Sequence, residues 1–123
     1  MGSAASLAVN SLLYRKLPYD PNTDFAGITM LAASLLVMVV PASLPVNNLK
    51  EFVEYAKRRP DAINFASVGN GNPLHLAAEL FKIGAGIEMT HVPYSGSVPA
   101  LTALMGNQVL TMFDAPLSSN PHI

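Results

Sequence analysis

The stretch "SVGNGNPLH" places two glycines among short polar side chains, directly before a pattern typical of an amphipathic helix. Gly69 and Gly71 permit positive φ angles and let a bound group approach the backbone closely. Ser67, Asn70 and Asn72 add uncharged hydrogen-bond donors, and the start of the helix adds unpaired N–H groups with a partial positive charge. This combination suits a small anion such as a carboxylate, although an ordinary turn followed by a helix cap has the same composition.

The same loop lacks the lysine of the nucleotide-binding pattern GxxxxGKS/T, so a nucleoside triphosphate is not expected. His75 follows the loop and precedes Glu79 by one helical turn, which is the spacing of two metal ligands on a helix face. No third ligand is near in the sequence, so we expect His75 to face the loop or a ligand rather than a metal. His91 lies in a strand-like stretch and is expected to be a packing histidine.

Two further polar loops follow strand-like stretches. Tyr94 and Ser95 lie in "PYSGS", and Asp114 follows "VLTMF". Because ligands bind beyond the carboxyl ends of the strands in an open α/β sheet, we expect these loops to line one edge of the sheet together with "SVGNGN". Two alternatives remain open, since "PYSGS" is also typical of a turn with a helix cap and Asp114 of a cap for the next helix.

Ser67, His75 and Asp114 supply the three residue types of a hydrolase triad. The GxSxG element that exposes a catalytic serine is missing. A histidine in the first turn of a helix would also need a fortunate geometry to activate Ser67. A small serine hydrolase that uses Ser67 and His75 is therefore the alternative to a binding site without catalysis.

Strand and helix patterns alternate along the chain with short connections, which predicts a largely parallel α/β sheet. Residues up to about Asp24 are interpreted as irregular, and the run from about Gly27 to Val40 as one long or two short buried strands. The other expected elements are the strands "AINFAS", "EMTHVPY" and "QVLTMFD", a helix that begins at Asn47 or Asn48, a helix capped by Asn72 and ended by Gly84 or Gly86, and a helix capped by Ser95 or Ser97.

The composition is that of one domain with a hydrophobic core. The 123 residues are 50% hydrophobic and 12% charged, and 7 basic against 8 acidic side chains give a formal charge of -1. Because phosphate binding needs clustered Lys and Arg, nucleic acid is not an expected partner. The absence of cysteine excludes disulfides, thiolate metal sites and a thiol nucleophile.

Residues 25–49 contain no charged side chain. A membrane helix needs about 20 apolar residues, and Pro41 and Pro45 interrupt this run. Its density of Val, Ile, Leu and Met is typical of strands that are buried on both faces, which we favour over a membrane span.

Several stretches, in order, resemble the Bug-type (tripartite tricarboxylate transporter) periplasmic solute-binding receptors: "LYRKLPYDPNTDFAGIT", "LVMVVPASLPVNNLKEFVEYAK", "INFASVGNGNPLHLAAELFK" and "THVPYSGSVPALTALMGNQVLTMFD". The resemblance implies a three-layer α/β lobe of the periplasmic-binding-protein type II kind, with a mostly parallel sheet and helices on both faces. It also implies that residues 1–25 are the end of a first-lobe segment with an extended connection. Residues 26–123 would then be a second-lobe domain that stops before the family's return strand.

The resemblance further assigns a small carboxylate to the "SVGNGN" loop, with His75 just inside the helix that follows. Tyr94 and Ser95 would lie at the cleft, and Asp114 near the distal end of the ligand. The implied loop contacts are backbone and side-chain donors of Ser67, Gly69, Asn70, Gly71 and Asn72.

Such a receptor would be periplasmic, with its signal peptide outside this chain, and would present a small organic acid or amino acid to membrane permease subunits. The resemblance implies no catalytic step, no metal and no cofactor. An alternative that stays open is an interaction module whose exposed half-cleft forms a homodimer.

Overall fold

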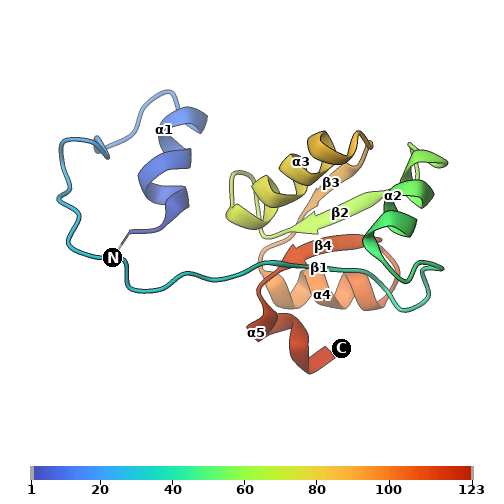
Figure 1. Ribbon diagram of the computed structural model, residues 1–123. Coiled ribbons are helices and arrows are strands. Elements are labelled where there is room, and N and C mark those ends of the chain that lie inside the picture. The colour runs from blue at the N-terminus through green and yellow to red at the C-terminus, as the bar shows by residue number, and fades with distance from the viewer. Residues whose placement is uncertain (1, 123) are drawn as a thin grey trace. The chain divides into compact units, whose positions relative to one another are not determined.

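The computed structural model describes residues 2–122, which form two compact units divided between Ser34 and Leu35 (Figure 1). In the first unit a π-helical segment, η1 (Ala5–Val9), continues into α1 (Asn10–Leu13).

The helix of the first unit corrects the interpretation of residues up to Asp24 as irregular. Residues 3–16 contain neither Gly nor Pro, so nothing in their sequence interrupts a helix. The segment that follows is irregular as expected, and the hydroxyl of Tyr19 ties it to the helix by donating to the carbonyl oxygen of Ser6 at 2.7 Å.

The second unit is built on a four-stranded sheet with the strand order β1-β4-β2-β3. β2 pairs in parallel with both β3 and β4, whereas β1 pairs antiparallel with β4. The mostly parallel α/β sheet that the sequence predicts is therefore confirmed. The strands are β1 (Val37–Val39), β2 (Asn64–Ser67), β3 (Thr90–Pro93) and β4 (Thr111–Asp114).

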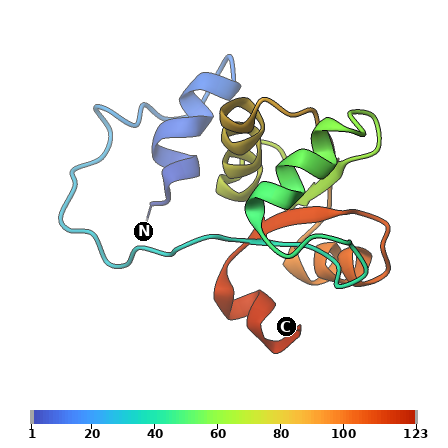
Figure 2. The same cartoon turned by 45° about the vertical axis from the view of Figure 1, so that its right-hand side comes forward.

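Helices cover both faces of this sheet, which gives the three layers that were expected (Figures 1 and 2). On one face α2 and α3 bury a cluster that includes Phe52, Phe65 and Ala78. On the other face α4 buries Leu101 and Leu104 against the strand residues that point to that side, such as Ala66 and Met112. Successive residues of a strand point to opposite faces, so Ala66 lies on the other side from Phe65. The helices are α2 (Leu49–Lys57), α3 (Pro73–Ala85), α4 (Ser97–Met105) and α5 (Pro116–Ser119), with a 3₁₀ turn η2 (Asn120–His122) after α5.

Local signals determine where the helices begin and end. The side chain of Asn48 caps α2 by accepting from the N–H of Glu51 at 3.0 Å, and Asn72 caps α3. Gly86 ends α3 in the left-handed conformation with φ of 61°. These predictions are confirmed.

The predicted cap of α4 by Ser95 or Ser97 was wrong. Gly96 occupies the cap position of α4, and no side chain accepts a hydrogen bond from the first turn. The hydroxyl of Ser97 donates instead to the carboxyl of Asp114 at 3.1 Å.

The prediction of buried strands from Gly27 to Val40 was wrong for most of this run. Only Val37–Val39 forms a strand, and it is half-buried. Ile28 and Met30, which belong to no strand, are 96% and 80% exposed. In the described part of the chain, β1 has β4 as its only neighbour. Within the same residues, no helix is both long and apolar enough to span a bilayer.

Candidate functional site

Three loops follow the strands at one edge of the sheet. β2, β3 and β4 run in the same direction, so their last residues, Ser67, Pro93 and Asp114, lie at the same edge. The N–H of Tyr94 donates to the carbonyl oxygen of Ser67 at 2.8 Å. The "PYSGS" loop therefore lies against the glycine loop, as the parallel topology predicts.

The backbone of the glycine loop has the conformation that only glycine adopts readily. Gly69 has φ of 119° and Gly71 has φ of 71°. A Cβ atom added at Gly69 would meet no heavy atom within 4 Å. The backbone angle, rather than a lack of space, therefore requires glycine at this position.

Two side chains that flank the loop, one at the end of β2 and one in α3, accept hydrogen bonds from its amides. The N–H of Gly69 donates to Oγ of Ser67 at 3.2 Å, and the N–H of Gly71 donates to Nδ1 of His75 at 3.2 Å. Within residues 2–122, the N–H groups of Asn70 and His75 have no acceptor. The N–H groups of Asn70 and His75 can therefore donate directly to a bound group. Those of Gly69 and Gly71 can do so only after their hydrogen bonds to side chains are broken.

A stack of aromatic rings lies beneath this loop. The rings of His75 and His91 are 4.1 Å apart between centroids, and that of Phe65 is 4.9 Å from His91. Nε2 of His91 is 2.6 Å from Oγ of Ser67, and this serine is fully buried. Ser67, which precedes the glycine loop, is thus connected through a hydrogen bond to a histidine on the neighbouring strand.

The hydrogen bond between Ser67 and His91 was missed by sequence reasoning, which treated His91 as a packing residue. The only signal is the register of two parallel strands, in which Phe65 lies opposite His91 and Ser67 follows two residues later on the same face. No local pattern in either strand specifies that register.

Burial lowers the pKa of His91, and the neighbouring His75 lowers it further, while the carboxylate of Glu79 acts in the opposite direction. Removal of an imidazolium from water disfavours the charged form, and a second imidazole beside it adds like-charge repulsion. His91 is therefore held in the neutral form, in which it can share a proton with Ser67.

The hydrolase triad is not assembled. Oγ of Ser67 lies against His91 rather than His75, and its complete burial denies it to a substrate. Nδ1 of His75 is occupied by the amide of Gly71. The third member, Asp114, contacts neither of them but accepts hydrogen bonds from two serine hydroxyls.

Asp114 is 1% exposed, and both of its carboxyl oxygens are engaged. Oδ1 accepts from the hydroxyl of Ser97 at 3.1 Å, and Oδ2 accepts from the hydroxyl of Ser118 at 2.6 Å. The carboxyl thereby joins the start of α4 to α5. It does not accept from a backbone N–H of α5, so the alternative that Asp114 caps this helix is also wrong.

The remaining predicted residues differ in exposure. Tyr94 is half-buried and packs against the cluster beneath α4, whereas Ser95 is exposed. His75 is partly exposed, and its Nε2 lies 3.8 Å from Glu79, which also pairs with Lys82 at 3.0 Å. Among residues 2–122 no three His, Cys, Asp or Glu side chains are arranged to hold a metal ion.

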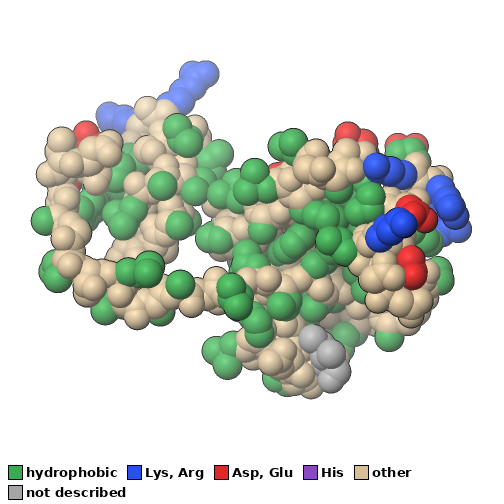
Figure 3. Space-filling model, viewed as in Figure 1, with side chains coloured by type: hydrophobic (Ala, Val, Ile, Leu, Met, Phe, Trp, Pro, Cys, Tyr) green, Lys and Arg blue, Asp and Glu red, His purple; other side chains and the backbone are tan. Residues whose placement is uncertain are grey.

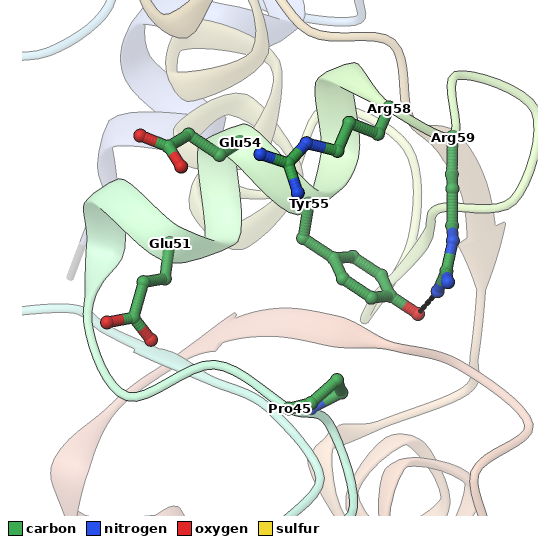
Figure 4. Close-up of a pocket in the computed structure, with 6 residues that line it drawn as sticks. All are labelled: Pro45, Glu51, Glu54, Tyr55, Arg58 and Arg59. Carbon is green, nitrogen blue, oxygen red and sulfur yellow. Dashed lines mark hydrogen bonds between the residues drawn. The ribbon is translucent and has the colours of Figure 1, made fainter.

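A pocket of about 280 Å³ lies away from this edge, beside α2 (Figure 4). Charged side chains gather over this part of the molecule, as Figure 3 shows. Arg59 donates to the hydroxyl of Tyr55 and stacks on its ring, with Cζ 4.4 Å from the ring centroid. Glu51, Glu54 and Arg58 also line the pocket, so its two carboxylates are balanced by two guanidinium groups.

Glycine-rich and polar loops line this edge of the sheet, which is where ligands bind in open α/β sheets. The family description "Tripartite tricarboxylate transporter family receptor" (TctC) matches residues 1–123. The chain therefore belongs to this family, which consists of transporter receptors and not of enzymes. Family members are periplasmic binding proteins, as the resemblance in the sequence implied.

Similar proteins support this assignment. A UPF0065 protein from the tcbD-tcbE intergenic region of Pseudomonas sp. is 33% identical over 121 residues, which are 98% of this chain and 36% of that protein. Protein BugT of Bordetella pertussis is 34% identical over 87% of this chain and 33% of its own length. The chain thus spans about a third of the length of these relatives.

Solved structures of receptors show the same fold. A structure described as a periplasmic transporter has a TM-score of 0.89 and 36% identity over 99% of this chain and 41% of its own. An R. palustris protein solved with adipate has a TM-score of 0.79 and 37% identity over 88% of this chain and 36% of its own. MatC from Rhodopseudomonas palustris with bound malate has a TM-score of 0.81 and 29% identity over 95% of this chain and 40% of its own.

Proposed function

We propose that this chain supplies one wall of a carboxylate site in a periplasmic solute-binding receptor. The site lies at the loops after β2 and β3. The donors are Gly69, Asn70, Gly71 and Asn72, with His75, Tyr94 and Ser95 beside them. Ser67 lies behind these donors, because it is fully buried and its hydroxyl is bonded to His91. The receptor holds the acid between this wall and a second lobe and presents it to membrane permease subunits.

The observation that carries this proposal is the glycine loop itself. Two positive-φ glycines lead directly into the capped first turn of α3, with amides of Asn70 and His75 that have no acceptor among residues 2–122. Unpaired N–H groups at a helix start favour an anion. The absence of Lys and Arg from this loop makes the interaction one of dipoles rather than of full opposite charges.

Two similar receptors were solved with adipate and with malate, and both ligands are dicarboxylates. A dicarboxylate is therefore the first ligand class to test on this chain. One carboxylate would lie at the glycine loop. We place Asp114 behind the site rather than in contact with the second carboxylate, because its oxygens already accept from Ser97 and Ser118.

Closure of a second lobe would order the site, so affinity depends on both walls. We expect the 123-residue chain alone to bind acids weakly, with dissociation constants of about 1 mM or higher, corresponding to about 4 kcal/mol. Amide NMR titration with malate and adipate tests this, because it detects weak binding residue by residue. Shifts confined to residues 67–75 and 94–95 are expected.

The control ligand is the diamide of adipic acid, which has the same length but no charge and should cause no shift. Gly69→Val, which the φ of 119° does not accommodate, should abolish the response, whereas Gly84→Ala on α3 should keep it, since a Cβ atom there meets nothing within 4 Å. Shifts around the α2 pocket instead of the loop would overturn the placement of the site. Micromolar binding by the chain alone would overturn the dependence on a second lobe.

A further inference from the structure

The hydrogen bond between Gly71 and His75 depends on the protonation state of the imidazole. Nδ1 of His75 accepts from the N–H of Gly71 at 3.2 Å. An imidazole nitrogen accepts only when it carries no proton, so neutral His75 has its proton on Nε2. That nitrogen lies 3.8 Å from Oε1 of Glu79, which is beyond hydrogen-bond distance.

Addition of a proton to His75 converts Nδ1 from an acceptor into a donor. The N–H of Gly71 and the new N–H of His75 then face each other as two donors, so their hydrogen bond is lost. Both groups need an acceptor at the same place, immediately before the first turn of α3. A carboxylate oxygen satisfies two donors at once, and a charged donor gives a stronger hydrogen bond than a neutral one.

Titratable groups face His75 from its own helix and from the neighbouring strand. On α3, Oε1 of Glu79 lies 3.8 Å from Nε2 of His75, and Oε2 of the same carboxylate pairs with Lys82 at 3.0 Å. On β3, the stacked ring of His91 is 4.1 Å away. Burial and the neighbouring His75 lower the pKa of His91, which favours the neutral form of that ring.

We propose that the protonation state of His75 controls a hydrogen-bond donor of the carboxylate site. Neutral His75 accepts a hydrogen bond from the N–H of Gly71. Protonated His75 no longer accepts it, and both His75 and the N–H of Gly71 then donate to a carboxylate. This inference rests on the proposed carboxylate site and adds a coupling between acid binding and proton uptake. Because linkage is reciprocal, a bound carboxylate in turn favours protonated His75.

The test has two readouts on the 123-residue chain between pH 8 and pH 5.5, a range in which histidine commonly changes its charge. Without any ligand, the amide NMR signal of Gly71 should shift with the ring signals of His75 and with the same midpoint. With formate, which stays ionised over this range, affinity should increase at least about fivefold on acidification, the lower end of typical coupling between sites.

One variant and one control sharpen the result. His75→Gln should abolish both pH dependences. His122→Gln, in η2, should change neither readout. A Gly71 signal that stays constant while His75 titrates would overturn the proposal, as would a formate affinity that is equal at both pH values.

The ligand-free readout separates this inference from the proposed function. If formate binds at neither pH while the Gly71 amide still follows His75, the carboxylate site fails and the proton-dependent release of the amide is supported. If formate binds at the loop with no pH dependence and no shift of Gly71, the carboxylate site stands and the role of His75 is overturned.

Discussion

The loops after β2 and β4 end at the same edge of one sheet, but their polar groups serve different purposes. After β2, the polar groups are the backbone amides of the glycine loop and the partly exposed side chain of His75. After β4, the carboxyl of Asp114 is 1% exposed and both oxygens accept from serine hydroxyls. Position at the ligand edge is therefore not sufficient for a ligand contact, because burial and prior hydrogen bonding decide whether a polar group is available.

The largest effect should come from the buried side of this comparison. Asp114→Ala removes an acceptor from Ser97 and Ser118, so we expect a loss of about 3 kcal/mol in the free energy of unfolding. Denaturant titration measures it. Ser95→Ala, at the same edge but exposed, should stay within about 0.5 kcal/mol. A stable Asp114→Ala chain that fails only in acid binding would show that Asp114 contacts the ligand.

Ser67 is buried like Asp114 but directly precedes the glycine loop. Ser67→Ala leaves Nε2 of His91 and the N–H of Gly69 without their partner, and we expect a loss of about 2 kcal/mol. Ser119→Ala is the matched control, because Ser119 is 1% exposed and its hydroxyl donates only to the carbonyl of Ala115. Its loss should be about 1 kcal/mol. Equal losses in the two variants would mean that the contact with His91 adds nothing to stability.

The cap of α3 should give a smaller effect on stability. Asn72→Ala removes the side chain that accepts from the N–H of Leu74 at 3.0 Å, which is worth about 1 kcal/mol. Thermal unfolding should report this loss, while Asn70→Ala, an exposed neighbour in the same loop, should be close to neutral. If Asn70→Ala is the more damaging of the two, the loop is held together by contacts other than the cap.

Features with a local cause were predicted from the sequence. Asn48, Asn72 and Gly86 mark helix ends through hydrogen bonds and backbone angles that involve only nearby residues, and the alternation of strands and helices gave the sheet. The glycine loop and its position before α3 followed from the same kind of signal.

Features that depend on residues distant in the sequence were not predicted. The register that brings His91 to Ser67 involves two strands whose residues are 24 positions apart, and no composition rule fixes it. The run before β1 looks like a buried strand by composition, but strand formation needs a hydrogen-bonded neighbour. Asp114 could not be placed because its serine partners come from two different helices.

The smallest predicted effect is a pH dependence that arises from His91. Its pKa is lower in the folded chain than the ordinary value of about 6.5, so the unfolded chain binds more protons below that value. Stability from His91 is therefore present above the ordinary pKa and is lost as the pH falls through the lowered one. We expect the free energy of unfolding to decline more steeply on acidification in the natural chain than in His91→Gln.

Denaturant titrations of both chains at several pH values measure this difference. His122→Gln controls for the loss of a histidine on the surface, because His122 is exposed. A parallel decline in the natural chain and in His91→Gln would mean that His91 titrates alike in the folded and unfolded states. The hydrogen bond between Ser67 and His91 would then not require a neutral imidazole. Asp114 would remain as the only evidence that burial distinguishes the loops after β2 and β4.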